Sequence, residues 1–192
     1  MAGPFSLVGQ YDQTNQGNRF CAFLAAAAAI PISNSTAPVA PLWNKAGSGV
    51  KLVLERMSFG YVSGTEAPGN ILVNQLQGAG SAAGAGLPLT SFTAGVINTT
   101  IFCTQLGAGK LPQGAFGTVA ALTTAGVPFM TTGHSYLTTT AATTSAPGWT
   151  ADYFFYDSVI LMPGTLIYPT APAATVSLYN TSIWWREVPV ND

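Results

Sequence analysis

The sequence predicts an all-β protein: a jelly roll or β-sandwich of about eight antiparallel strands, with long Gly/Ala- and Thr-rich loops and an N-terminal arm. Short runs of β-branched and aromatic residues recur along the 192 residues, and Gly (21) and Pro (13) punctuate them. No segment has a sustained helical period of apolar residues. Charged residues make up only 7% of the chain, against roughly 25% in an ordinary soluble domain.

The chain divides into a polar arm and one domain. Residues 1–19 are rich in Gly, Asn and Gln and have no apolar period, so we expect an N-terminal arm or a peripheral strand, followed by a single domain over 20–192. The start of the chain lacks a basic region followed by an apolar core, which predicts no signal peptide. The apolar run Phe20–Ile32 is too short to cross a bilayer, which needs about 20 apolar residues. Synthesis in the cytoplasm is therefore expected, with no contact to a membrane.

Two early segments have less regular patterns. Phe20–Ala29 is rich in Ala, which favours a helix, but its short length and the following Pro31 fit a buried strand equally well. Residues 33–49 contain two prolines and two glycines, and we predict a loop there.

The clearest strand is Lys51–Val62, where apolar and polar residues nearly alternate. The alternation slips once, at Glu55–Arg56, which predicts a β-bulge. Further strands are predicted at Ile71–Leu76, Val96–Leu106, within Val119–Met130 (one strand or two) and at Leu166–Pro169, and loops at 78–90, 107–117 and 131–148.

The C-terminal third has the strongest β pattern. Tyr153–Leu161 is rich in aromatic and β-branched residues. Met162–Thr165 has Pro second and Gly third, the chemistry of a type II turn. Val176–Val188 is the last predicted strand, and its alternation weakens near Asn180–Ser182, where a second bulge is expected.

The charged residues favour no catalytic or nucleic-acid chemistry. The six Lys and Arg residues are scattered singly, whereas phosphate binding needs them clustered. The sequence has no motif of a nucleotide-binding or hydrolytic enzyme, and its one histidine, His134, lies in a Thr-rich segment. We therefore predict a non-enzymatic protein without cofactor or metal. Asp157 is interpreted as a solvated strand residue or an ion-pair partner of Arg56 or Arg186 rather than as part of an active site.

The two cysteines, Cys21 and Cys103, lie in apolar runs and have no metal-ligand spacing. Free buried thiols are the favoured interpretation, with a disulfide between them left open.

The aromatic residues point to an interface. Adjacent residues of a strand face opposite sides of the sheet, so Trp184 and Trp185 must diverge, and Tyr153–Tyr156 must place two rings on each side. Outward rings on a sheet with few charges are typical of a surface that another protein covers. Phe154, Tyr156, Trp184 and Trp185 are the predicted oligomer or capsid interface residues, unless a loop of the same chain covers the rings.

Two segments resemble a known family. The C-terminal segment VILMPGTLIYPTAPAATVSLYNTSIWWREVP resembles the closing strands of the jelly-roll decoration, or cement, proteins of tailed bacteriophages, and the strand KLVLERMSFGYVSGT resembles their early core strands. The resemblance implies a homotrimer on the capsid surface of the virion that binds the major capsid protein and stabilises the head. The alternative is a receptor- or carbohydrate-binding module of a phage fibre or tail, with sugars stacked on Trp43, Trp149 or Tyr136.

Overall fold

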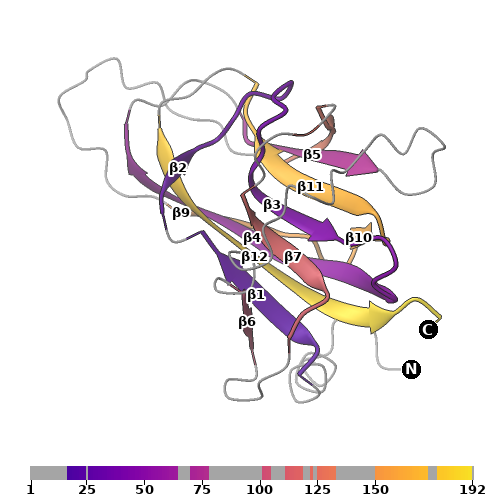
Figure 1. The fold of residues 1–192 in the computed structure, drawn as a ribbon. Helices are drawn as coiled ribbons and strands as arrows, with labels where there is room; N and C mark the ends of the chain where they lie inside the picture. Colours follow the sequence, from indigo (N-terminus) through magenta and orange to yellow (C-terminus); the bar gives the residue numbers. More distant parts are fainter. Residues whose placement is uncertain are drawn as a thin grey trace.

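The computed structural model describes residues 17–24, 26–64, 70–77, 101–104, 111–118, 122, 125–132, 150–172 and 177–191. These residues form two antiparallel sheets of strands and no helix, so the predicted β-sandwich is confirmed (Figure 1). They contain twelve strands rather than about eight. The predicted loop 78–90 and most of the predicted N-terminal arm lie outside the described residues, although Arg19, placed in the arm, is already the first residue of β1.

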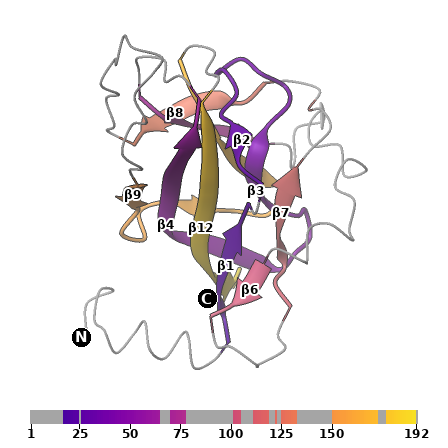
Figure 2. The same cartoon turned by 90° about the vertical axis from the view of Figure 1, so that its left-hand side faces the viewer.

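The larger sheet is built on two long strands, β4 (Val50–Ser63) and β12 (Leu178–Pro189), which pair along almost their whole length (Figure 2). β1 (Arg19–Phe23) pairs with the other side of β12 and in turn with β6 (Ile101–Cys103). The remaining strands of this sheet are β2 (Ala28–Ala29), next to β12, and β9 (Thr150–Phe154) and β10 (Ile160–Leu161), both next to β4. The ambiguous segment Phe20–Ala29 thus forms strands.

The second sheet packs against the first and has five strands in the order β7-β3-β11-β5-β8. Their bounds are Gly114–Thr118 (β7), Val39–Asn44 (β3), Thr165–Thr170 (β11), Leu72–Gln77 (β5) and Val127–Thr131 (β8). The predicted turn before β11 is confirmed, because the amide of Thr165 donates to the carbonyl of Met162 (3.1 Å) and Gly164 has a φ of 86°.

The core lies between the two sheets and is made by alternate residues of each strand. Every second residue of β12 from Tyr179 to Glu187 is buried. Trp185, the largest of these, is completely buried and stacks on Phe20 with 5.9 Å between ring centroids. Burial of such large side chains supplies most of the driving force for folding.

One predicted bulge is confirmed and the other is misplaced. Trp184 pairs with Arg56 and Trp185 with Leu54, so Glu55 is the extra residue that the slip in alternation indicated. No bulge occurs at Asn180–Ser182, because Thr181 takes an inward position between Tyr179 and Ile183 in an unbroken alternation. The second irregularity of this strand pair lies between Leu178 and Tyr179.

Two segments predicted as loops contain strands. β3 lies within 33–49, and its proline is accommodated because Pro41 follows Ala40, a residue with φ of 51°, at the irregularity between β3 and β7. β7 lies at the end of 107–117, where its small residues let it approach the core closely. A side-chain carbon on Gly114 would meet Leu52 at 3.0 Å and the Trp185 ring nitrogen at 3.3 Å.

The predicted strand Tyr153–Leu161 is interrupted. β9 ends at Phe154 and β10 begins at Ile160, and both continue along the same side of β4. Between them the chain leaves the sheet in a turn and returns, with the amide of Phe155 donating to the carbonyl of Glu55 (2.9 Å) and the amide of Leu54 to that of Val159 (3.0 Å). This turn shapes the outer face of the larger sheet.

Candidate interaction surface

The outer face of the larger sheet has a row of side chains that crosses its strands. Cys21 of β1 is opposite Trp184 of β12, Trp184 is opposite Arg56 of β4, and Arg56 is opposite Phe154 of β9. Side chains directly opposite each other on neighbouring strands lie on the same face of a sheet. The register therefore brings together residues that are distant in the sequence.

Arg56 lies between two aromatic rings in this row. Its guanidinium carbon is 4.3 Å from the centroid of the Trp184 ring and 5.8 Å from that of Phe154. Each contact is a cation–π interaction, which contributes about 0.5–2 kcal/mol depending on exposure. The bulge at Glu55 makes this arrangement possible, because it leaves both Glu55 and Arg56 half-buried on a strand that would otherwise alternate.

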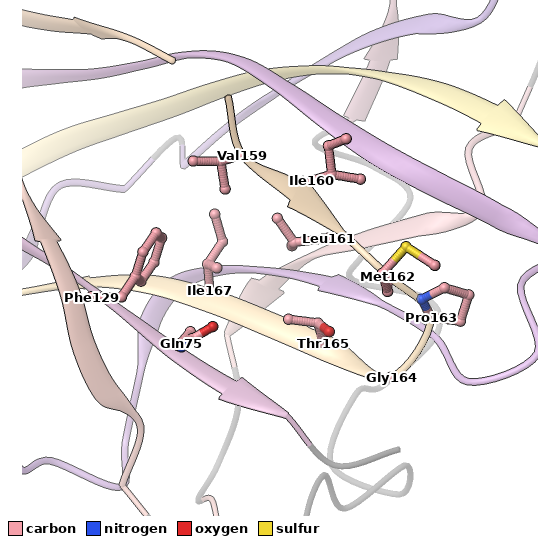
Figure 3. Close-up of a pocket in the computed structure, with 10 residues that line it drawn as sticks. All are labelled: Gln75, Phe129, Val159, Ile160, Leu161, Met162, Pro163, Gly164, Thr165 and Ile167. Carbon is pink, nitrogen blue, oxygen red and sulfur yellow. The ribbon is translucent and has the colours of Figure 1, made fainter. Parts of the chain in front are cut away.

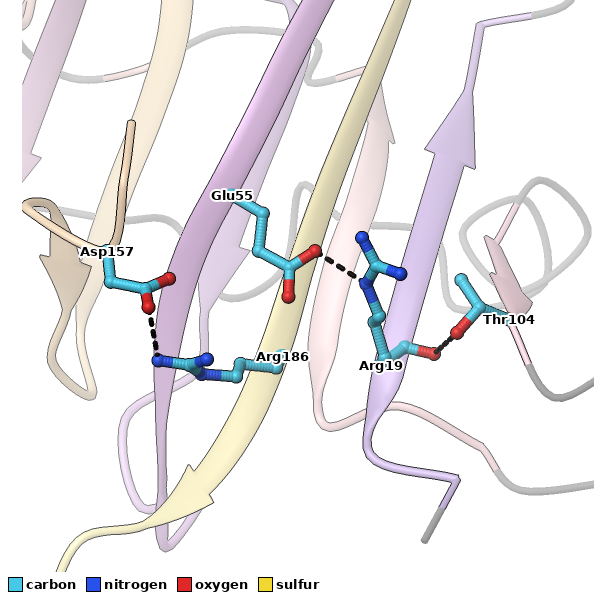
Figure 4. Close-up of polar contacts among 5 residues, drawn as sticks. All are labelled: Arg19, Glu55, Thr104, Asp157 and Arg186. Carbon is cyan, nitrogen blue, oxygen red and sulfur yellow. Dashed lines mark hydrogen bonds and ion pairs between the residues drawn. The ribbon is translucent and has the colours of Figure 1, made fainter. Parts of the chain in front are cut away.

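Three ion pairs lie within and beside the row (Figure 4 shows two of them). Arg19 Nε lies 2.6 Å from Glu55 Oε2, Arg186 Nη2 lies 2.7 Å from Asp157 Oδ2, and Arg56 Nε lies 3.3 Å from Asp152 Oδ1. The first two are the stronger pairs, because their side chains are only 10–27% exposed and solvent screens them less.

These pairs correct the interpretation of the arginines as scattered and confirm that of Asp157 as an ion-pair partner. The charges are separated in the sequence but not in the fold, since all three arginines of the chain are paired on one face. Asp157 is an ion-pair partner of Arg186, one of the two partners predicted for it. The pairs neutralise the face from within the chain, so a partner does not have to supply the counter-charges.

The turn between β9 and β10 projects aromatic groups from this face. Tyr156 and Asp157 have φ values of 50° and 60°, a left-handed conformation that is uncommon for a bulky residue such as tyrosine. Such strain costs about 1–3 kcal/mol per residue and is typical of functional surfaces. The turn leaves Tyr156 66% exposed, with its ring centroid 6.0 Å from that of Phe154, itself 47% exposed. The burial of Phe155 anchors the turn.

A hollow of about 350 Å³ opens between these groups. Its lining contains two arginines and two carboxylates, whose charges cancel, together with three aromatic rings. The lining residues are Arg19, Glu55, Arg56, Phe154, Tyr156, Asp157 and Trp184. Arg, Trp and Tyr are the residue types most enriched where protein interfaces are strongest.

Three of the four predicted interface residues lie on this surface. Phe154, Tyr156 and Trp184 line the hollow together. Trp185 does not belong to it, because it is completely buried in the core and cannot contact another chain. The three arginines, Arg19, Arg56 and Arg186, were not predicted from the sequence to lie on this surface. The slip in alternation at Glu55–Arg56 was the one sequence signal for the charged residues of the surface, because the bulge turns both side chains outward.

The other residues considered in the sequence lie elsewhere. Trp43, a candidate platform for sugars, is 2% exposed in β3 and is withdrawn from that role. Trp149, Tyr136 and His134 are outside the described residues. Cys21 and Cys103 are free thiols, as favoured, although both are half-buried rather than buried. Burial raises the pKa of the Cys21 thiol, Arg19 opposes this shift, and Cys103 adds to it.

Within the described ranges, no group of His, Cys, Asp or Glu residues is arranged to hold a metal ion. The same part of the chain has no helix of the length and apolarity needed to span a membrane. Comparison of the chain with protein-family models, with curated proteins and with solved structures finds no match.

Proposed function

We propose that this chain is a structural protein of a virus particle: a homotrimeric jelly-roll decoration protein that binds the phage head and stabilises it. The order of the strands supports the jelly roll. β9 and β10 are counted here as one strand, and β2, β6 and β7 are left aside. The eight remaining strands are numbered 1 to 8 in chain order: β1, β3, β4, β5, β8, β9 with β10, β11 and β12. In this numbering they occur in the order 1-8-3-6 in one sheet and 2-7-4-5 in the other. This order is that of two interlocked Greek keys.

The observation that supports assembly best is the neutral aromatic surface. Its arginines are held by carboxylates of the same chain, and Phe154 and Tyr156 are its most exposed aromatic side chains. A surface of this kind contacts a partner through apolar area and aromatic edges rather than through charge. The major capsid protein in its assembled lattice is the proposed partner, since binding the lattice but not free subunits stabilises the shell by mass action.

The test is co-sedimentation of the purified chain with heads assembled without it. Replacing Phe154 and Tyr156 together with serine is expected to weaken binding at least about thirtyfold, since central aromatic residues of interfaces contribute about 2 kcal/mol or more. Val62→Ser is the matched control, because Val62 is 49% exposed on β4 and does not line the hollow. Equal binding of the double variant and the wild type would show that this face is not the contact.

The hollow also favours a second candidate function, carbohydrate binding. Its lining offers rings together with equal numbers of cationic donors and anionic acceptors, which suits a neutral ligand with many hydroxyl groups. Trp184 in the lining makes binding visible as a change in fluorescence. Titration with neutral oligosaccharides decides between the roles: a saturable change that Tyr156→Ser abolishes supports the module, and no change favours assembly.

A further inference from the structure

A second surface lies where the outermost strands of the two sheets approach each other. Val127 and Phe129 of β8 are 65% and 36% exposed, and Ile160 and Met162, in and after β10, are 50% and 46% exposed. These four side chains, here called the apolar edge, account for four of the nine exposed large hydrophobic residues in the described part of the chain. They are distinct from the residues that line the hollow with Arg56.

Three of the four side chains of the apolar edge line a cavity beside the core. A cavity of about 250 Å³ lies between β8 and β10, and Phe129, Ile160 and Met162 form part of its wall (Figure 3). Leu161 and Ile167, each 1% exposed, also line the cavity. None of its ten lining residues is charged. The cavity therefore lies directly against side chains of the core.

Both strands are the last of their sheets in the described part of the chain. Proteins usually protect such edges with charged residues, and Lys is the most frequent. β8 (VPFMT) and β10 (IL) contain no charged residue, and only Pro128 in β8 and the two-residue length of β10 limit pairing with a further strand. An edge with this composition is suited to permanent burial, because obligate interfaces are more apolar than transient ones.

We propose that the apolar edge is the contact between copies of this chain. A surface that meets its own copy brings identical charges close together near the symmetry axis, so a region without charge is compatible with itself where a charged one is not. The edge also has protruding aliphatic side chains beside a cavity with an uncharged lining, so one copy can insert Ile160 or Met162 into the cavity of the next. The proposal locates the self-association that the proposed function assumes.

The experiment is native mass spectrometry of the full chain, supported by sedimentation equilibrium. The wild type is expected to be an oligomer, and Ile160→Lys is expected to weaken its association at least about tenfold. Val62→Lys is the matched control: an aliphatic strand residue of nearly equal exposure, 49% against 50%, that lies outside the apolar edge. Its oligomer is expected to equal that of the wild type.

Circular dichroism of each variant shows whether it folds, and Met162→Lys replaces Ile160→Lys if that variant does not. A wild type that is a monomer at all concentrations overturns the inference, as does a folded lysine variant with unchanged association. The two proposals fail separately. A monomer that still binds heads contradicts the edge contact and the trimer but leaves the decoration role standing, and an oligomer that ignores heads contradicts only the decoration role.

Discussion

Glu187 joins the two sheets, and its replacement by glutamine is expected to destabilise the protein by about 2 kcal/mol. The side chain is on β12, is 7% exposed, and accepts hydrogen bonds from the first sheet and the second. Its Oε1 receives the amides of Gln113 (2.8 Å) and Gly114 (2.9 Å) and the ring nitrogen of Trp185 (3.3 Å). The two amides belong to the start of β7 and the residue before it, so the carboxylate holds an edge strand of one sheet against the other.

The magnitude follows from the change in these bonds. A hydrogen bond to a charged group contributes about 1.5–3 kcal/mol and a neutral bond about 0.5–1.5 kcal/mol, so each of the two short amide bonds loses about 1 kcal/mol. The new amide group would also stand at the Oε2 position, which is 3.1 Å from the amide donor of Gln113. Removing a buried charge regains part of this loss, because glutamine is cheaper to desolvate.

The assay is urea unfolding followed by tryptophan fluorescence, with calorimetry expected to show a decrease of about 4–8 °C in Tm. Asp152→Asn is the control. It removes one carboxylate at a side chain that is 40% exposed, where an ion pair contributes about 0–1 kcal/mol. Equal stability of Glu187→Gln and the wild type, within about 0.5 kcal/mol, would refute the inter-sheet role of Glu187. Equal destabilisation by Asp152→Asn would refute the argument from burial.

Three further predictions concern other parts of the fold. Tyr168→Phe is expected to destabilise the protein by about 1–2 kcal/mol in urea unfolding, because the Tyr168 hydroxyl accepts the buried amide of Gly126 (2.7 Å); an unchanged midpoint would contradict this. Tyr156→Gly is expected to retain or gain up to about 1 kcal/mol of stability, because glycine adopts the left-handed conformation without strain; a clear loss would mean that the ring holds the turn. In Cys103→Ser, alkylation of Cys21 is expected to accelerate only at a pH above the usual thiol range, since burial raises its pKa. The stabilisation that Cys21 contributes is present at neutral pH and is lost as the pH rises through that raised value.

Local patterns in the sequence predicted the features that depend on neighbouring residues. The alternation in Lys51–Val62 located both β4 and the bulge at Glu55, and Pro163-Gly164 located the turn before β11. β3 and β7 could not be found in this way. Proline and glycine usually end strands, and here both are tolerated because of an irregular register and close packing against the core.

The candidate surface could be predicted only in part for the same reason. Alternation alone indicated that Trp184 and Trp185 face opposite sides of the sheet, but not which of them faces the core. The pairing of Arg19 with Glu55 and of Arg186 with Asp157 depends on the order of β1, β12 and β4 in the sheet. Composition showed a chain with few charges, and the fold shows that those on this face neutralise one another.

Attachment to the phage head as a function of salt concentration tests the central claim most directly. The wild-type chain is bound to heads that lack it, and the fraction released is measured from about 0.1 M to about 1 M NaCl, where the screening length falls from about 10 Å to about 3 Å. We expect attachment to be nearly constant, because the arginines of the surface are paired within the chain and Phe154 and Tyr156 provide an uncharged contact. Release of most of the protein as the salt concentration rises would contradict the account, because it would mean that charge holds the protein on the shell.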